Sequence, residues 1–199
     1  MQSASIGRRI CLLITTLTLV IFVVSASHAQ GPPSHQFASN QWRAELRREL
    51  PLLGHRNWIL IVDSAYPLQN TPGLQVIETH AGLIDVLSGT LTEIASSRHV
   101  RANIFQDAEL AYIPEADAKG ITQCRERLHT ALGPEDASGA PVLLPHEDLI
   151  AKVTDAGKNF HVLVLKTDEV LPYTSVFIQL DCKYWSADAE QRLRDAMAH

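Results

Sequence analysis

The chain alternates between short, continuous apolar runs and longer stretches in which apolar residues recur every three or four positions. Two of the short runs, Trp58–Asp63 and Phe160–Leu165, are almost wholly apolar and rich in β-branched residues. Such runs are typical of strands that are buried on both faces of a sheet. Further strands are predicted at Leu74–Glu78, Val100–Phe105, Pro141–Leu144 and Ser175–Leu180.

Stretches with helical spacing lie between these strands. In Ala81–Ser97 the apolar residues include Leu83, Leu87 and Leu91, which fall on one face of a helix. The alternation of strands and helices predicts an α/β fold, with a single-domain sheet flanked by helices. Other helices are predicted at Gln41–Leu50, Ala116–Leu132 and His146–Ala156, with a last helix, capped by Ser186, as a C-terminal extension.

The first residues follow a different pattern, in which positive charge precedes an apolar run and then small residues. Arg8 and Arg9 come before the run Ile10–Val24, and Ser27–Ala29 offers a small-x-small cleavage site. This pattern predicts a cleaved secretory signal peptide over residues 1–29, and therefore a secreted or periplasmic protein without stable membrane insertion. The alternative is an uncleaved anchor, but the run is short for a span of roughly 20 residues.

Residues 30–40 contain Gly, Pro, Ser and Asn, which predicts a flexible leader before a domain over residues 41–199. The chain of 199 residues is 46% hydrophobic and 20% charged, values that are typical of a globular protein. A net charge of −5 argues against a nucleic-acid-binding protein. After signal cleavage Cys124 and Cys182 remain, and either a disulfide or two free thiols is compatible with the sequence.

Candidate chemistry lies at the strand ends, where ligands bind in open α/β sheets. Imidazole, carboxylate, phenol and hydroxyl groups together suit proton transfer on a hydroxylated ligand. Each candidate also has an ordinary structural explanation, such as bracing a turn or packing against a neighbour. No spacing of ligand residues indicates zinc, and no glycine motif indicates a nucleotide, so neither a metal nor a cofactor is predicted. The candidates are His55, Asn57, Asp63, His146, Tyr173, Thr174 and Ser175.

Three ordered segments resemble the D-ribose pyranase and L-fucose mutarotase family. The first, Leu53–Pro67, has a Gly-His turn, an apolar strand and then Asp63 with a nearby proline. The second, Leu144–Leu149, resembles the Thr-His-Glu segment of the ribose-type enzymes. The third, Leu163–Val176, resembles a strand followed by a Pro-Tyr-Ala-Asn segment. The segments occur in the family's order over residues 55–182.

The resemblance implies an α/β protein that isomerises a monosaccharide without a cofactor, by opening and closing the sugar ring. It also implies a ring-like homo-oligomer with sites near subunit contacts. On this resemblance His55 would donate a proton, while Asp63 and His146 would hold sugar hydroxyls. Tyr173 would be a second catalytic group that closes the site, and the predicted further substrate contacts are Asn57, Thr174 and Ser175.

The chain also departs from the family pattern. Asn57 stands where the family turn has Asp, and Ser175 stands where the family has Asn. Loss of the turn carboxylate removes one acid–base group, so a monosaccharide-binding protein that kept the fold without turnover is an alternative. A secreted structural or assembly module is a third hypothesis. Convergence of His55, Asp63, His146 and Tyr173 in one cleft would favour the enzyme.

Overall fold

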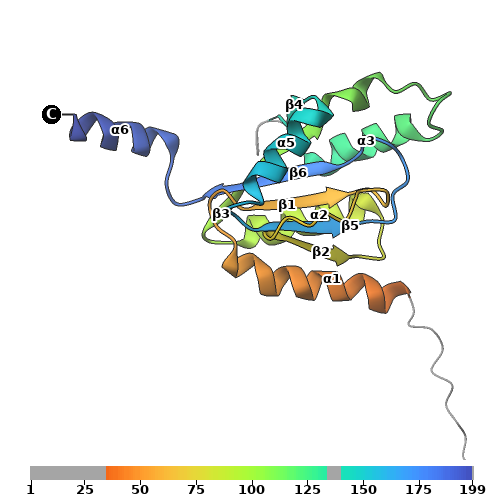
Figure 1. Ribbon diagram of the computed structural model, residues 1–199, viewed down its shortest axis with the longest axis horizontal. Helices are drawn as coiled ribbons and strands as arrows, with labels where there is room; N and C mark the ends of the chain where they lie inside the picture. Colours follow the sequence, from red (N-terminus) through yellow and green to blue (C-terminus); the bar gives the residue numbers. More distant parts are fainter. Residues whose placement is uncertain (1–34, 134–139, 199) are drawn as a thin grey trace, which may run out of the picture. The chain divides into compact units, whose positions relative to one another are not determined.

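The computed structural model describes residues 35–133 and 140–198, and shows an α/β fold as predicted. In these residues six strands form one mixed sheet in the order β2-β5-β1-β6-β3-β4 (Figure 1). The predicted signal peptide, residues 1–29, lies outside the described residues. The strands are β1 (Trp58–Val62), β2 (Leu74–Glu78), β3 (Val100–Asp107), β4 (Val142–Leu144), β5 (Val162–Lys166) and β6 (Val176–Cys182).

The strands run in two directions, so the side of the sheet at which most strands end differs chemically from the side at which they begin. β2, β5 and β1 pair in parallel, as do β3 and β4, whereas β6 is antiparallel to both of its neighbours, β1 and β3. The C-terminal ends of β1 and β3 therefore meet the start of β6 at one edge, which we call the carboxyl edge. At the opposite edge, the amino edge, β1 and β3 begin and β6 ends.

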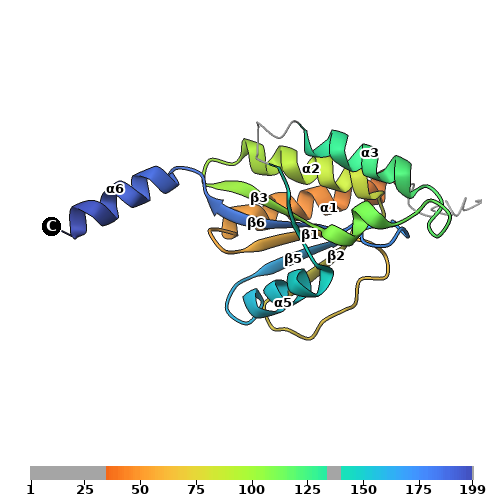
Figure 2. The same ribbon diagram turned by 90° about the horizontal axis from the view of Figure 1, so that it is seen from above.

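Helices cover both faces of the sheet. One face packs on α1, α2 and α3 through residues such as Leu46, Leu87 and Leu128, and the other face packs on α5 through Leu149 and Val153. Figure 2 shows α5 on the opposite side of the sheet from α2 and α3. The helices are α1 (His35–Glu49), α2 (Leu83–Ser96), α3 (Ile121–Leu132), α5 (His146–Ala156) and α6 (Ala187–Met197), with short 3-10 helices η1 (Leu50–Leu52) and η2 (Ala108–Tyr112).

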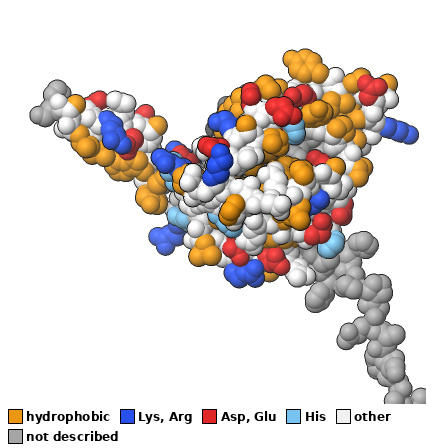
Figure 3. All heavy atoms as spheres, viewed as in Figure 1, with side chains coloured by type: hydrophobic (Ala, Val, Ile, Leu, Met, Phe, Trp, Pro, Cys, Tyr) orange, Lys and Arg blue, Asp and Glu red, His pale blue; other side chains and the backbone are white. Residues whose placement is uncertain are grey.

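The last helix, α6, follows β6 and contains no buried residue. The predicted cap is confirmed, because the Ser186 hydroxyl accepts a hydrogen bond of 3.1 Å from the backbone amide of Ala189. Figure 3 shows hydrophobic side chains along one side of this helix. Leu193 and Met197 are among its exposed apolar residues. Within the described residues, the helices are too short or too polar to cross a membrane.

The structure corrects several predicted boundaries. α1 begins at His35, so residues 35–40 of the predicted leader belong to a helix. α3 begins at Ile121 rather than at Ala116, because Gly120 adopts a left-handed conformation (φ 95°) that ends the preceding turn. β3 continues two residues beyond its predicted end, to Asp107. The two cysteines left open by the sequence are free thiols.

Candidate functional site

The carboxyl edge brings together two acidic residues on either side of a serine. Asp63 follows β1 directly, Asp107 is the last residue of β3, and Ser175 precedes β6, the strand between them. The Ser175 hydroxyl donates to Asp63 Oδ2 at 3.2 Å, and the Ala65 amide donates to Asp63 Oδ1 at 2.9 Å. These contacts hold the Asp63 carboxylate at the sheet edge, where it is only half-buried.

A histidine is fixed beside the second carboxylate. His146 is the first residue of α5, and its Nδ1 lies 3.0 Å from Asp107 Oδ1. The Glu109 carboxylate accepts the His146 backbone N–H at 3.0 Å, which fixes the start of the helix. The Tyr173 ring meets the imidazole edge-on, with 5.4 Å between ring centroids. No described residue hydrogen-bonds to His146 Nε2, and the side chain is 34% exposed, so this nitrogen is available to a ligand.

Burial changes the acidity of the Asp107 carboxyl. Its side chain is 0% exposed, and burial raises its pKa to about 6, with the charges of Glu109 and Asp63 acting in the same direction. The hydrogen bond and charge of His146 act against this shift. Among the described residues, Asp107 Oδ2 has no hydrogen-bond partner. This carboxyl group therefore exchanges its proton in the pH range in which an imidazole also titrates.

The arrangement can carry a proton to and from a bound hydroxyl. An ionised Asp107 holds the proton of His146 on Nδ1, which leaves Nε2 as the base. Asp63 offers carboxylate oxygens to ligand hydroxyls, and Tyr173, which is partly exposed, offers a phenol. The described residues thus place acid, base and hydrogen-bonding groups at one edge of the sheet.

Thr174 has a different role from the predicted contact with substrate. Its side chain is fully buried, and its hydroxyl donates to the Leu171 carbonyl at 2.9 Å. Tyr173, directly before it, has a left-handed backbone (φ 57°), which a non-glycine residue adopts only when its surroundings hold it there. Thr174 therefore braces the turn that presents Tyr173.

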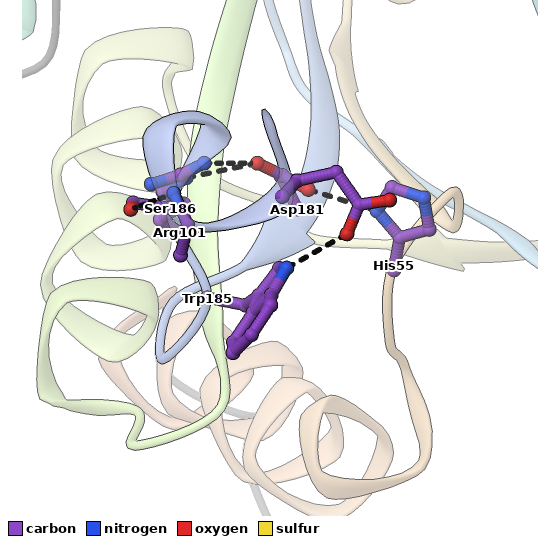
Figure 4. Close-up of polar contacts among 7 residues, drawn as sticks. His55, Arg101, Asp181, Trp185 and Ser186 are labelled. Carbon is purple, nitrogen blue, oxygen red and sulfur yellow. Dashed lines mark hydrogen bonds and ion pairs between the residues drawn. The ribbon is translucent and has the colours of Figure 1, made fainter. Parts of the chain in front are cut away.

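His55 lies at the amino edge, at the opposite end of β1 from Asp63. The strand between them has five residues, a length of roughly 16 Å at ~3.3 Å per residue. Figure 4 shows His55 and Arg101 on the carboxylate of Asp181, with 2.8 Å between His55 Nδ1 and Oδ1 and 2.9 Å between Arg101 Nε and Oδ2. A single chain therefore does not bring His55 to Asp63, contrary to the predicted single cleft.

Asn57 also lies at the amino edge and is occupied by backbone contacts. Its Oδ1 accepts the Gly54 amide at 2.7 Å, and its Nδ2 donates to the His161 carbonyl at 3.2 Å. Both ends of the side-chain amide are used to close the turn before β1. Within one chain Asn57 therefore lies with His55 at the amino edge and away from Asp63 at the other end of β1.

Sequence reasoning missed Asp107 and Glu109. The prediction ended β3 at Phe105, before the polar residues Gln106 and Asp107, both of which are buried. The same signal that selected Asp63, an acid at the end of a strand, would have selected Asp107 had β3 been extended.

The chain was compared with known proteins. No family model matches it, and no curated protein matches it in sequence. Similar solved structures include RbsD from Bacillus subtilis complexed with D-ribose, with 18% identity, a TM-score of 0.48, and coverage of 69% of this chain and 92% of that chain. FucU from Bifidobacterium longum has 15% identity, a TM-score of 0.48 and the same coverage, 69% and 92%. The fucose mutarotase from Streptococcus pneumoniae complexed with L-fucose has 17% identity, a TM-score of 0.45 and coverage of 69% and 91%. At these identities and scores the likeness does not assign this chain to a family.

Proposed function

We propose that the chain interconverts the ring forms or anomers of a monosaccharide by acid–base catalysis at the carboxyl edge, without a cofactor. The observation that carries the proposal is the His146–Asp107 pair, whose Nδ1–Oδ1 distance is 3.0 Å. A buried carboxylate that fixes one imidazole nitrogen leaves the other for proton transfer. The predicted signal peptide adds that the protein acts in the periplasm or outside the cell.

The sequence resemblance supports this choice of reaction. Its second and third segments, which supply His146 and Tyr173, lie against each other at the carboxyl edge. The end of its first segment supplies Asp63, which Ser175 of the third segment contacts. Segments far apart along the chain thus contribute to one group of side chains.

The proposed reaction needs two proton transfers and no other reactant. His146 Nε2 takes the proton of the anomeric hydroxyl while the Tyr173 hydroxyl gives a proton to the ring oxygen, and the bond between the anomeric carbon and the ring oxygen breaks. The open-chain aldehyde turns about the adjacent carbon–carbon bond. Ring closure then returns both protons in the reverse direction. Positioned acid–base groups accelerate such steps by ~10²–10⁴-fold.

Magnetisation-exchange NMR of D-ribose and L-fucose tests the proposal. We expect wild type to accelerate exchange between the sugar's ring forms, and His146→Ala to lower the rate at least tenfold, because the general base is lost. The matched control is His80→Asn, which removes an exposed imidazole after β2 at a left-handed position that Asn tolerates, and it should leave the rate unchanged. Equal rates for wild type, His146→Ala and buffer would exclude the proposed activity, and sugar binding without exchange would favour the non-catalytic alternative.

A further inference from the structure

A cleft of about 360 Å³ lies at the amino edge, between the end of α5 and the sheet. It follows from the order of side chains along one face of the sheet. Phe105 and Phe177 are paired across β3 and β6 and form part of the apolar face that α5 covers. The next pair outward on that face is Asn103 and Gln179, so the apolar cover gives way to polar side chains.

The lining of this cleft offers polar atoms that the protein leaves unused. Asn103, Gln179 and Asn159 all line it. Their side-chain amides form no hydrogen bond with any other described residue. Each amide provides both donors and acceptors, which suits the hydroxyl groups of a small polar ligand.

The charges that line the cleft are unevenly matched. Asp181 binds Arg101 and His55 (Figure 4), and Asp155 pairs with Lys158 at 3.1 Å. Two lining cations, Arg56 and Lys152, have no carboxylate partner among the described residues.

Arg56 lies over the Phe160 ring, with 5.9 Å between the guanidinium carbon and the ring centroid. The uncommitted charge of the cleft is therefore positive, although the whole chain has a net charge of −5.

We propose that this cleft binds a small polyhydroxylated oxyanion, such as a sugar that bears a phosphate or carboxylate group. Arg56 and Lys152 would hold the oxyanion, and the amides of Asn103 and Gln179 would hold hydroxyl groups. The volume is within the range of small-molecule sites, roughly 300–1,000 Å³. The proposal is tested separately from the reaction proposed above, because within one chain His146 begins α5 and the cleft lies at the other end of this helix.

Isothermal titration calorimetry of the full chain tests this inference. The probes are D-ribose 5-phosphate, D-gluconate, D-ribose and inorganic phosphate. We expect the two sugar oxyanions to bind more tightly than D-ribose and than inorganic phosphate, and less tightly at high salt. Lys152→Gln should weaken their binding about tenfold, the loss of one charge-assisted contact. Lys119→Gln, which removes an exposed lysine that does not line the cleft, should have little effect.

Several results would overturn the inference. If D-ribose bound as tightly as the sugar oxyanions, there would be no anion site. If inorganic phosphate bound as tightly as the sugar oxyanions, the hydroxyl groups would contribute nothing to binding. Equal effects of Lys152→Gln and Lys119→Gln would mean that the ligand binds elsewhere. His146→Ala should leave D-ribose 5-phosphate binding unchanged, so failure here and failure of the proposed isomerase give different results.

Discussion

Asp107 combines complete burial with an ionisable carboxyl group. Burial raises its pKa to about 6, and only one of its two oxygens has a hydrogen-bond partner among the described residues. In its ionised form this group opposes folding, because a buried charge loses its hydration. The same charge fixes the proton of His146 on Nδ1, so a cost in stability accompanies the chemistry.

Replacement of Asp107 by Asn separates these two effects. The folded pKa is above the ordinary value of 3.8, so the favourable contribution of this group is fully present below that value and is lost as the pH rises through about 6. We therefore expect Asp107→Asn to increase the free energy of unfolding at pH 7.5, by on the order of 2 kcal/mol, with a smaller difference at pH 4. Urea denaturation at the two pH values measures this.

Sugar exchange should respond in the opposite way to the same substitution. Wild-type exchange should fall as the pH decreases through about 6, because Asp107 gains a proton, and Asp107→Asn should be slow at every pH. The stability prediction would be contradicted if Asp107→Asn were less stable than wild type at pH 7.5 and equally stable at pH 4.

Single residues were predictable where their position along a strand decides their place. Asp63, His146, Tyr173 and Ser175 were all selected from strand ends, and the structure brings them to one edge. His55 and Asp63 flank the same strand, so their separation follows from the length of β1 alone. The family resemblance, which assigns both residues to one site, does not include this geometry.

At the scale of elements, two helices of similar length differ in what they contribute. α5 places Leu149 in the apolar layer on one face of the sheet, where it is 0% exposed. α6 has no buried residue, and Leu193 in this helix is 44% exposed. Burial of apolar side chains against the sheet stabilises α5, whereas α6 depends on local contacts such as the Ser186 cap and the Glu190–Arg194 ion pair.

Matched leucine truncations test this difference. Leu149→Ala should lower the free energy of unfolding by about 2–4 kcal/mol, because it removes apolar contacts and leaves a cavity. Leu193→Ala should change it by less than about 0.5 kcal/mol. Urea denaturation of both variants measures the two values, and a large loss for Leu193→Ala would mean that α6 packs on something in solution.

Elements with a clear period were the most predictable. The bounds of α5 are as predicted, since His146–Ala156 has a regular apolar spacing and follows a proline. The start of α3 was predicted too early because the residues before Gly120 also favour helix, while the left-handed glycine interrupts them. Local preference does not reveal which of two acceptable backbones the chain takes.

At the scale of the whole molecule, the two edges raise the question of how His55 could assist the site. Within one chain His55 is held at the amino edge by Asp181. Only the His55 of a second copy could therefore reach the carboxyl edge of this chain. We expect the protein to form a homo-oligomer in which this contact is made. Light scattering should then give a multiple of the chain mass, which is 22.0 kDa before removal of the predicted signal peptide.

Mixed oligomers test whether His55 acts across that contact. His55→Ala and His146→Ala should each lower sugar exchange, and co-expression of the two should restore part of the lost rate, because some contacts then pair two intact residues. A monomer, or a full rate in His55→Ala, would limit the chemistry to the carboxyl edge of one chain.

The antiparallel strand β6 runs from the carboxyl edge to the amino edge and contacts the polar groups at both. Ser175, just before its start, bonds Asp63, and Asp181, near its end, bonds Arg101 and His55. A slide of this strand by one residue would exchange the side chains on its two faces and place the polar Gln179 in the apolar layer that contains Ile178 and Leu180. Within one chain the register of β6 is therefore fixed, and we expect ligand binding at one edge to leave the affinity at the other edge of the same chain unchanged.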